Sequence, residues 1–171
     1  MSAQVIENAI TEMLKGEEQK IALDYVSFMS ANEMPPEWSN GVWICYYKNK
    51  PVCVMFINGD ESIPGPWTIW HSGYDPKYDP EEIPEGEDGD KVGLIDLSVD
   101  ERLKETAWTH INICGNCGCG RQPGRHTTVF GKEFDNVCTS TLAFTNPDAV
   151  TIECVKQLAE LMKLGYSKII N

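Results

Sequence analysis

Three cysteines lie close together in the segment Cys114-Gly-Asn-Cys117-Gly-Cys119, and Cys138 follows later in the chain. A position in a hydrophobic core needs only one small apolar residue, whereas clustered thiols can share a metal ion or exchange disulfides. The C-x-x-C-x-C cluster is therefore the first candidate for chemistry in this sequence.

The first interpretation of the cluster is a structural zinc site. The glycine after Cys117 lets backbone N–H groups turn toward the sulfurs of Cys114 and Cys117 and stabilise their negative charge. Further residues could complete a tetrahedral set, namely Cys119, Cys138, His110 and His126. Zinc suits a reduced thiolate set because it needs no redox chemistry. The metal-ligating candidates are Cys114, Cys117, Cys119 and Cys138.

Two other interpretations of the same thiols stay open. Redox motifs usually place the nucleophilic thiol at a helix N-terminus, whereas Cys114 should lie near the C-terminal end of the preceding helix, which argues against an efficient oxidoreductase. The thiols could also be unliganded residues of a glycine-rich loop. Because exposed thiols are easily oxidised, a metal or disulfide link between them is favoured over unliganded thiols.

The C-x-x-C-x-C spacing also resembles the metal claw of nitrile hydratases, with Gly118 at the position of that family's serine. This resemblance implies a metal-dependent hydro-lyase, which joins the thiol–disulfide reductase as an enzyme alternative. The three histidines have no serine or cysteine partner in a nucleophile motif, so no catalytic residue is assigned.

Aromatic side chains form the second candidate group, and they come mostly from an expected sheet and a helix that packs on it. Tryptophans that cannot all be buried often line clefts. In an acidic protein, ring faces beside a carboxylate such as Glu101 or Glu105 would favour an apolar cation. A tryptophan-rich core is the alternative. The ligand-binding candidates are Trp43, Trp67, Trp70, Glu105 and Trp108.

The N-terminal region supplies two helical stretches. Apolar residues of the segment 5–14 recur on one face of a helix that should falter near Gly16, and a second helix should end before Asn32. We expect residues 1–32 to form a helical segment, either a hairpin or one kinked helix, that covers a sheet.

The next region is rich in β-branched, aromatic and cysteine residues. Residues 42–47 and 52–57 predict a hairpin, because 48–51 interrupts them as a turn. After Pro64-Gly65-Pro66, residues 67–71 predict a third strand. The simplest topology is a three-stranded antiparallel meander.

An acidic stretch precedes the cysteine cluster. Residues 75–91 contain eight acidic residues and three prolines, which predicts a surface loop. A helix should begin after Ser98, whose spacing to Glu101 matches a capping box, and Ile111 should share its apolar face. This helix would lead directly into the cysteines.

The C-terminal region predicts two strands and one long helix. Residues 127–130 and 137–144 have strand character. Asn146-Pro147-Asp148 should supply the N-cap and first positions of an amphipathic helix that stops at Gly165. We therefore expect a single α+β domain over 1–171, an antiparallel sheet with helices packed against it.

The charge composition of the chain limits the kinds of binding partner that we expect. A net charge of -12 would repel phosphate backbones and anionic membrane surfaces, so neither nucleic acid nor membrane is expected. The N-terminus lacks the basic and apolar regions of a secretory signal, and Cys45, Cys53 and Cys154 lie among apolar residues as reduced core thiols do. We expect a cytoplasmic protein.

From residue 41 onward, the order Trp43-x-Cys-Tyr-Tyr-Lys-x-Lys-Pro-Val-Cys53, Gly65-Pro-Trp-Thr-Ile, helix, strand and amphipathic helix resembles bacterial GyrI-like small-molecule-binding domains and their uncharacterised single-domain relatives. The resemblance implies a cleft for apolar, often cationic, compounds. The cysteine loop and the acidic stretch depart from that family.

The sequence thus predicts a small-molecule-binding or regulatory module with a thiolate site. The enzyme alternatives would use the same thiols for catalysis. A third possibility is a protein-interaction module that uses the acidic segment 75–91.

Overall fold

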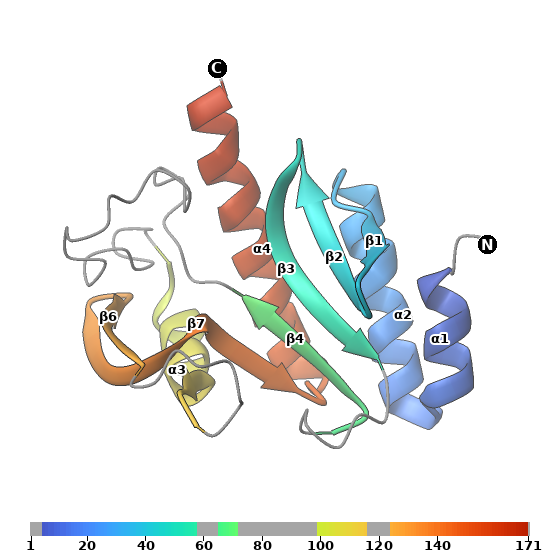
Figure 1. The fold of residues 1–171 in the computed structure, drawn as a ribbon, viewed down its shortest axis with the longest axis horizontal. Coiled ribbons are helices and arrows are strands. Elements are labelled where there is room, and N and C mark those ends of the chain that lie inside the picture. The colour runs from blue at the N-terminus through green and yellow to red at the C-terminus, as the bar shows by residue number, and fades with distance from the viewer. Residues whose placement is uncertain (1–4, 58–64, 72–98, 116–123, 171) are drawn as a thin grey trace. The chain divides into compact units, whose positions relative to one another are not determined.

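The computed structural model of this chain describes residues 5–57, 65–71, 99–115 and 124–170. Within these ranges the chain forms helices and strands in the order α1 (Ile6–Met13), α2 (Gly16–Ala31), β1 (Pro36–Ser39), β2 (Val42–Tyr47), β3 (Lys50–Ile57), β4 (Trp67–His71), α3 (Glu101–Thr109), β5 (Ile111–Ile113), β6 (Arg125–Val129), β7 (Lys132–Thr145) and α4 (Ala149–Ile170) (Figure 1). The strands form one antiparallel sheet in the order β1-β2-β3-β4-β7-β5, and β6 also pairs with β7. The α+β prediction is confirmed.

The chain packs as two compact units. The first comprises residues 1–70 and 144–159, and the second comprises residues 71–143 and 160–171. The first unit therefore holds α1, α2 and the strands β1 to β3, and the second holds α3, β5 and β6. The elements β4, β7 and α4 contribute to both.

In the first unit, side chains of the strands alternate between two faces of the sheet. One face packs against helices, and its buried side chains include Trp43, Cys45, Met55, Trp67 and Ile69. Tyr25 of α2 is fully buried, and its hydroxyl lies 3.4 Å from the Cys53 sulfur of β3, so α2 covers this face. The ammonium of Lys156 lies 2.6 Å from Asp24, which places the start of α4 beside α2.

Two tight turns set the strand register in this unit. β1 and β2 are joined at Asn40-Gly41, and β2 and β3 at Lys48-Asn49. All four residues have positive φ, as the hairpin turn that matches strand twist requires. The expected hairpin and the third strand are present, and β1 extends the meander by a strand that we did not predict.

The second unit is built around α3 and the β6–β7 hairpin. Asp100 caps α3, since its carboxylate accepts a hydrogen bond of 2.8 Å from the Leu103 backbone N–H. The helix ends at Thr109, and the short strand β5 then pairs with β7, with Ile111 opposite Leu142. Buried residues of this unit include Leu103, Ala107, Val129, Val137 and Leu142.

Two predictions about α3 were wrong. Its N-cap is Asp100, not Ser98, because the Asp100 carboxylate reaches the backbone N–H of the first turn. Ile111 does not belong to the helix, because its pairing with β7 draws it into β5. The cysteine segment therefore follows a strand in the chain rather than the end of a helix. The acidic stretch 75–91, which we predicted to be a surface loop, lies outside the described residues.

Two predictions about α4 were also wrong. Asp148 caps the helix, since its carboxylate accepts a 2.7 Å hydrogen bond from the Thr151 backbone N–H, whereas the backbone of Asn146 pairs with Trp67. The helix also continues through Gly165 to Ile170. Glycine costs only about 1 kcal/mol inside a helix, and the buried Tyr166 directly after it favours continuation.

The segment around Asn146 yields a stability prediction. Gly65 has φ +74°, and a Cβ there would lie 2.7 Å from the Thr145 methyl and 2.8 Å from the Asn146 side-chain nitrogen. Gly41 has φ +90° but nothing within 4 Å of such a Cβ. Both alanine variants carry backbone strain of about 1 kcal/mol. We expect Gly65→Ala to lower the free energy of unfolding by about 1–2 kcal/mol more than Gly41→Ala, because only Gly65 adds a steric clash. Urea unfolding of both variants measures this, and equal losses would contradict it.

Candidate functional site

One asparagine holds the two ends of the cysteine loop together. The Cys114 backbone N–H donates a hydrogen bond of 2.6 Å to the Asn136 carbonyl, and the Asn136 side-chain amide donates one of 3.1 Å to the Cys114 carbonyl. The Gly124 N–H donates a hydrogen bond of 2.8 Å to the Asn136 side-chain oxygen. We call this arrangement the Asn136 clamp. It fixes where the segment 115–123 leaves the sheet and where it returns.

Gly124 is packed directly against Cys114. A Cβ at Gly124 would lie 2.6 Å from the Cys114 Cβ and 2.5 Å from the Asn136 carbonyl carbon. No side chain fits in that space, so glycine lets the two ends of the loop touch. Cys114 and Gly124, which flank the segment that carries Cys117 and Cys119 in the sequence, therefore lie in direct contact.

The structure places two of the four predicted zinc ligands. Cys114 is buried at 9% exposure, and the half-buried Cys138 lies on β7, two residues beyond Asn136. Cys117 and Cys119 lie outside the described residues. Among the residues that are described, no group of three His, Cys, Asp or Glu could hold a metal ion, and the five cysteines form no disulfide with one another.

The two histidines considered as further ligands are engaged through their Nδ1 atoms. His110 Nδ1 lies 2.8 Å from the Thr106 carbonyl, and His126 Nδ1 lies 2.6 Å from an oxygen of Asp135. These contacts leave Nε2 as the ring nitrogen through which either histidine could bind a metal, and the zinc site stays a prediction.

The three tryptophans of β2 and β4 do not share one face. Trp43 and Trp67 point into the helix-covered core, where they are 2% and 0% exposed. Trp70 is half-buried on the opposite face, because it lies an odd number of residues from Trp67 along the same strand. Its ring centroid lies 4.3 Å from that of Phe56 at an interplanar angle of 57°.

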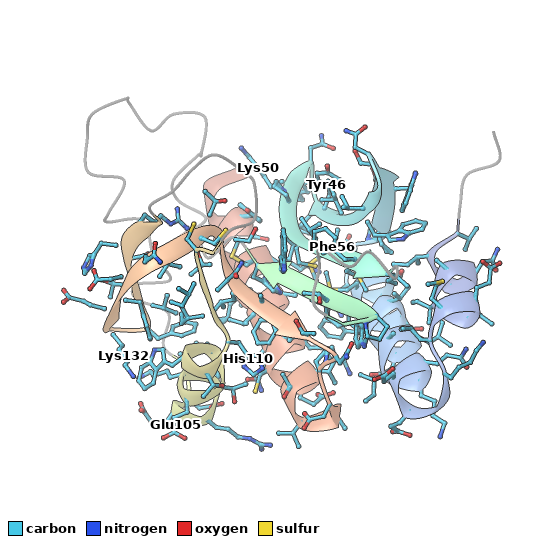
Figure 2. The ribbon with its side chains drawn as sticks, turned by 60° about the horizontal axis from the view of Figure 1, so that its bottom comes forward. Tyr46, Lys50, Phe56, Glu105, His110 and Lys132 are labelled. Carbon is cyan, nitrogen blue, oxygen red and sulfur yellow. The ribbon has the colours of Figure 1, made fainter. Side chains whose placement is uncertain are left out.

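Trp70 belongs to a set of apolar side chains that we call the aromatic face. The β-sheet register aligns Ile44, Val54 and Trp70 in one row across β2, β3 and β4. Phe56 is the next residue on this side of β3, and Tyr46 follows Ile44 along β2 (Figure 2). Ile44, Val54 and Trp70 are half-buried and expose part of their apolar surface, whereas Phe56 is buried at 8% exposure.

The other two binding candidates lie in the second unit. Trp108 of α3 donates a 2.7 Å hydrogen bond from its indole nitrogen to the Val129 carbonyl, and the Lys132 ammonium lies 5.1 Å from its ring centroid. The Trp108 ring therefore already carries an internal cation. Glu105 is exposed on the same helix, and both Glu105 and Lys132 are marked in Figure 2.

Phe56 and Asn136 are the candidate site residues that the sequence analysis missed. Phe56 could have been found, because it alternates with Val54 along a predicted strand and so shares its face. Asn136 gives no local signal, because its partners lie 12 and 22 residues away in the sequence.

No family model, curated protein or solved structure matches this chain. Among the described residues, no helix is both long enough and apolar enough to cross a membrane.

His71, the residue after Trp70, is a buried titratable group. It is 2% exposed, and burial lowers the pKa of its imidazole from 6.5 to about 4. The ring is therefore neutral in the folded protein at neutral pH, and protonation is favoured only in the unfolded chain.

This pKa predicts a pH-dependent stability. Between pH 6.5 and about 4, the unfolded chain binds a proton at His71 that the folded chain does not. The free energy of unfolding should therefore fall as pH drops through this window, by about 3 kcal/mol in total. Urea unfolding of the wild type and of His71→Gln at pH 7 and pH 4 tests this. The wild type should lose more stability than the variant, and parallel losses would contradict the assignment.

Proposed function

We propose that this protein is a small-molecule-binding or regulatory module of the cytoplasm, and that its aromatic face takes a small apolar cation. The observation that carries the proposal is the contact between the half-buried Trp70 ring and the buried Phe56 ring on the side of the sheet opposite the helices. Tyr46, also half-buried, adds a further ring to this face. Aromatic rings attract cations through their faces and bury apolar groups, so such a surface suits a lipophilic cation.

Charge supports the same class of ligand. The net charge of -12 raises the local concentration of cations around the molecule and lowers that of anions. The Lys132 ammonium against the Trp108 ring is an internal example of such a contact in this chain. The resemblance to GyrI-like domains suggests the same ligand class.

This proposal retains only part of the set of ligand-binding residues that the sequence predicted. Trp43 and Trp67 are core residues that support the sheet from behind, and they would not touch a ligand on the aromatic face. Trp70 is the tryptophan of that face. Glu105 and Trp108 belong to the second unit, where a cation would compete with Lys132 for the Trp108 ring.

A titration with tetraphenylphosphonium, followed by tryptophan fluorescence, tests the aromatic face. We expect saturable binding to the wild type and roughly tenfold weaker binding to Trp70→Leu, because one cation–π contact is worth about 1 kcal/mol or more. Trp38→Leu is the matched control, since Trp38 is 47% exposed on β1 and lies outside the aromatic face. Neutral triphenylphosphine oxide should bind more weakly than the cation. Equal affinities of the two tryptophan variants would refute the assignment.

We further propose that the cysteine loop holds a structural zinc ion through Cys114, Cys117, Cys119 and Cys138. The Asn136 clamp supports this proposal, because it brings the two ends of the loop together beside β7, the strand that carries Cys138. Zinc binding would then add to the folding free energy of the second unit.

Elemental analysis tests the zinc proposal. Protein purified under reducing conditions should contain one zinc per chain. Cys117→Ser should lose the metal and unfold at a lower temperature, whereas Cys154→Ser should keep it, because Cys154 is a buried thiol of α4. Absence of zinc from the wild-type protein would refute the proposal.

The enzyme alternative is less well supported. Cys114 directly follows strand β5 in the chain, so it does not begin a helix whose N-terminus would lower its pKa, as the thiol of a redox motif usually does. Cys114→Ser separates the classes: lost turnover with an intact fold would favour catalysis, and lost stability with intact ligand binding would favour a structural clip. Deletion of 75–91 tests the interaction alternative.

A further inference from the structure

Four side chains form a sulfur-rich group in the core of the first unit, which we call the core sulfur cluster. Cys45 and Cys53 lie directly opposite each other on β2 and β3. The Cys45 sulfur lies 4.0 Å from the Met55 sulfur, and the Cys53 sulfur lies 3.4 Å from the Tyr25 hydroxyl.

The cluster is fully enclosed. Tyr25, Cys45 and Met55 are 0% exposed, and Cys53 is 2% exposed. A buried hydroxyl needs a strong partner to offset its lost hydration, and a thiol is only a weak one. Phenylalanine and valine would fill the same space without this cost. The chain therefore concentrates soft, polarisable donors at one point of a core that could have been wholly apolar.

We propose that the core sulfur cluster is a binding site for a soft monovalent metal ion, copper(I). Thiolate and thioether sulfurs are the ligands that select copper(I). Three sulfurs at about 2.3 Å from a metal in a trigonal plane lie about 4.0 Å from one another. The Cys45–Met55 sulfur separation of 4.0 Å has this value before any ion is added.

The donor set distinguishes copper(I) from zinc. Zinc takes cysteine, histidine or carboxylate ligands in a tetrahedron, and no group of three such residues was found in the described parts of the chain. Methionine is a ligand for soft ions, and three-coordinate sulfur geometry suits copper(I). The Tyr25 oxygen borders the site and can accept or donate a hydrogen bond at Cys53.

The same enclosure argues against a reactive dithiol. A hydrogen bond with Cys53 and burial both raise the pKa of the Cys45 thiol well above its ordinary value. The Cys45 thiol therefore stays protonated at neutral pH and is a poor nucleophile toward disulfides or peroxides. A bound metal ion can still displace such a proton, because metal–sulfur bonds replace the sulfur–hydrogen bond.

Binding is then a ligand exchange without electron transfer. Copper stays in the +1 state, copper–sulfur bonds replace the S–H bonds of both thiols, and the two released protons pass to solvent. The ion and the two thiolates then carry one net negative charge, which is costly in a core unless a hydrogen-bond donor faces it. The Tyr25 hydroxyl, 3.4 Å from the Cys53 sulfur, can donate to that thiolate.

Competition with bicinchoninate under anaerobic, reducing conditions tests the site. The loop thiols must first be blocked so that they do not bind the copper. Iodoacetamide added to the native protein alkylates accessible cysteines and should leave the buried Cys45 and Cys53 reduced. Peptide mapping verifies the pattern. Copper(I) is added in two ways, to the native alkylated protein and during its refolding, because the helices that cover the closed site must open before an ion can enter. We expect the alkylated protein to bind one equivalent of copper(I) in competition with bicinchoninate.

Met55→Leu and Met34→Leu form a matched pair for this experiment. Both methionines are 0% exposed, and leucine has nearly the same volume, so both variants should fold. Met55→Leu should weaken copper(I) binding at least tenfold, and Met34→Leu should leave it unchanged. Failure of the alkylated protein to compete with bicinchoninate in both loading protocols, or equal affinities of the two variants, would overturn the proposal.

Discussion

The pairing of β2 with β3 determines what each face of the first unit can do. Cys45 lies opposite Cys53, and Ile44 lies opposite Val54. Because neighbouring residues of a strand point to opposite faces, a shift of one residue would exchange the two sets. This register places the thiols beneath the helices and assembles the aromatic face on the other side. The aromatic face and the core sulfur cluster therefore depend on the same backbone pairing.

Local features hold this register. The two-residue turn at Lys48-Asn49 fixes Tyr47 opposite Lys50, and both turn residues adopt the left-handed conformation. Lysine favours that conformation less than asparagine or glycine, so the strands must stabilise the turn. A bulge between Cys45 and Tyr46 absorbs one residue of β3. Without this extra residue, Lys50 could not lie opposite Tyr47 while Ile44 stays opposite Val54.

Strands with strong local signals could be predicted from the sequence. The residues of β2, β3 and β4 are rich in β-branched and aromatic types, so their position was evident before any pairing was known. β1 begins at Pro36 and contains Glu37, both of a type depleted in strands, so the single aromatic Trp38 is a weak signal and the strand conformation depends on pairing with β2. β5 is only three residues long and exists because β7 lies beside it. Short strands of this kind are set by their neighbours rather than by their own composition.

The candidate site shows the same division between local and long-range information. Trp67 and Trp70 were grouped because both are tryptophans, yet their spacing along one strand already separates them onto opposite faces. That error could have been avoided from the sequence. The Asn136 clamp could not have been predicted from the sequence, because asparagine is a residue typical of turns. In the structure Asn136 has the positive φ of a turn residue, 57°, yet it lies inside a long strand. Its role follows from three-dimensional proximity to Cys114 and Gly124.

Burial, more than the number of cysteines, separates the chemistry open to the two sulfur groups. The interior disfavours charge for any ionisable group, which is why the pKa of His71 falls while that of Cys45 rises: both shifts favour the neutral form. An ion that enters such a place needs ligands that lose their protons on binding, and the Tyr25 hydroxyl beside Cys53 can donate a hydrogen bond to the thiolate that results. Cys138 is only half-buried, so the cost of burying charge is smaller there than in the core.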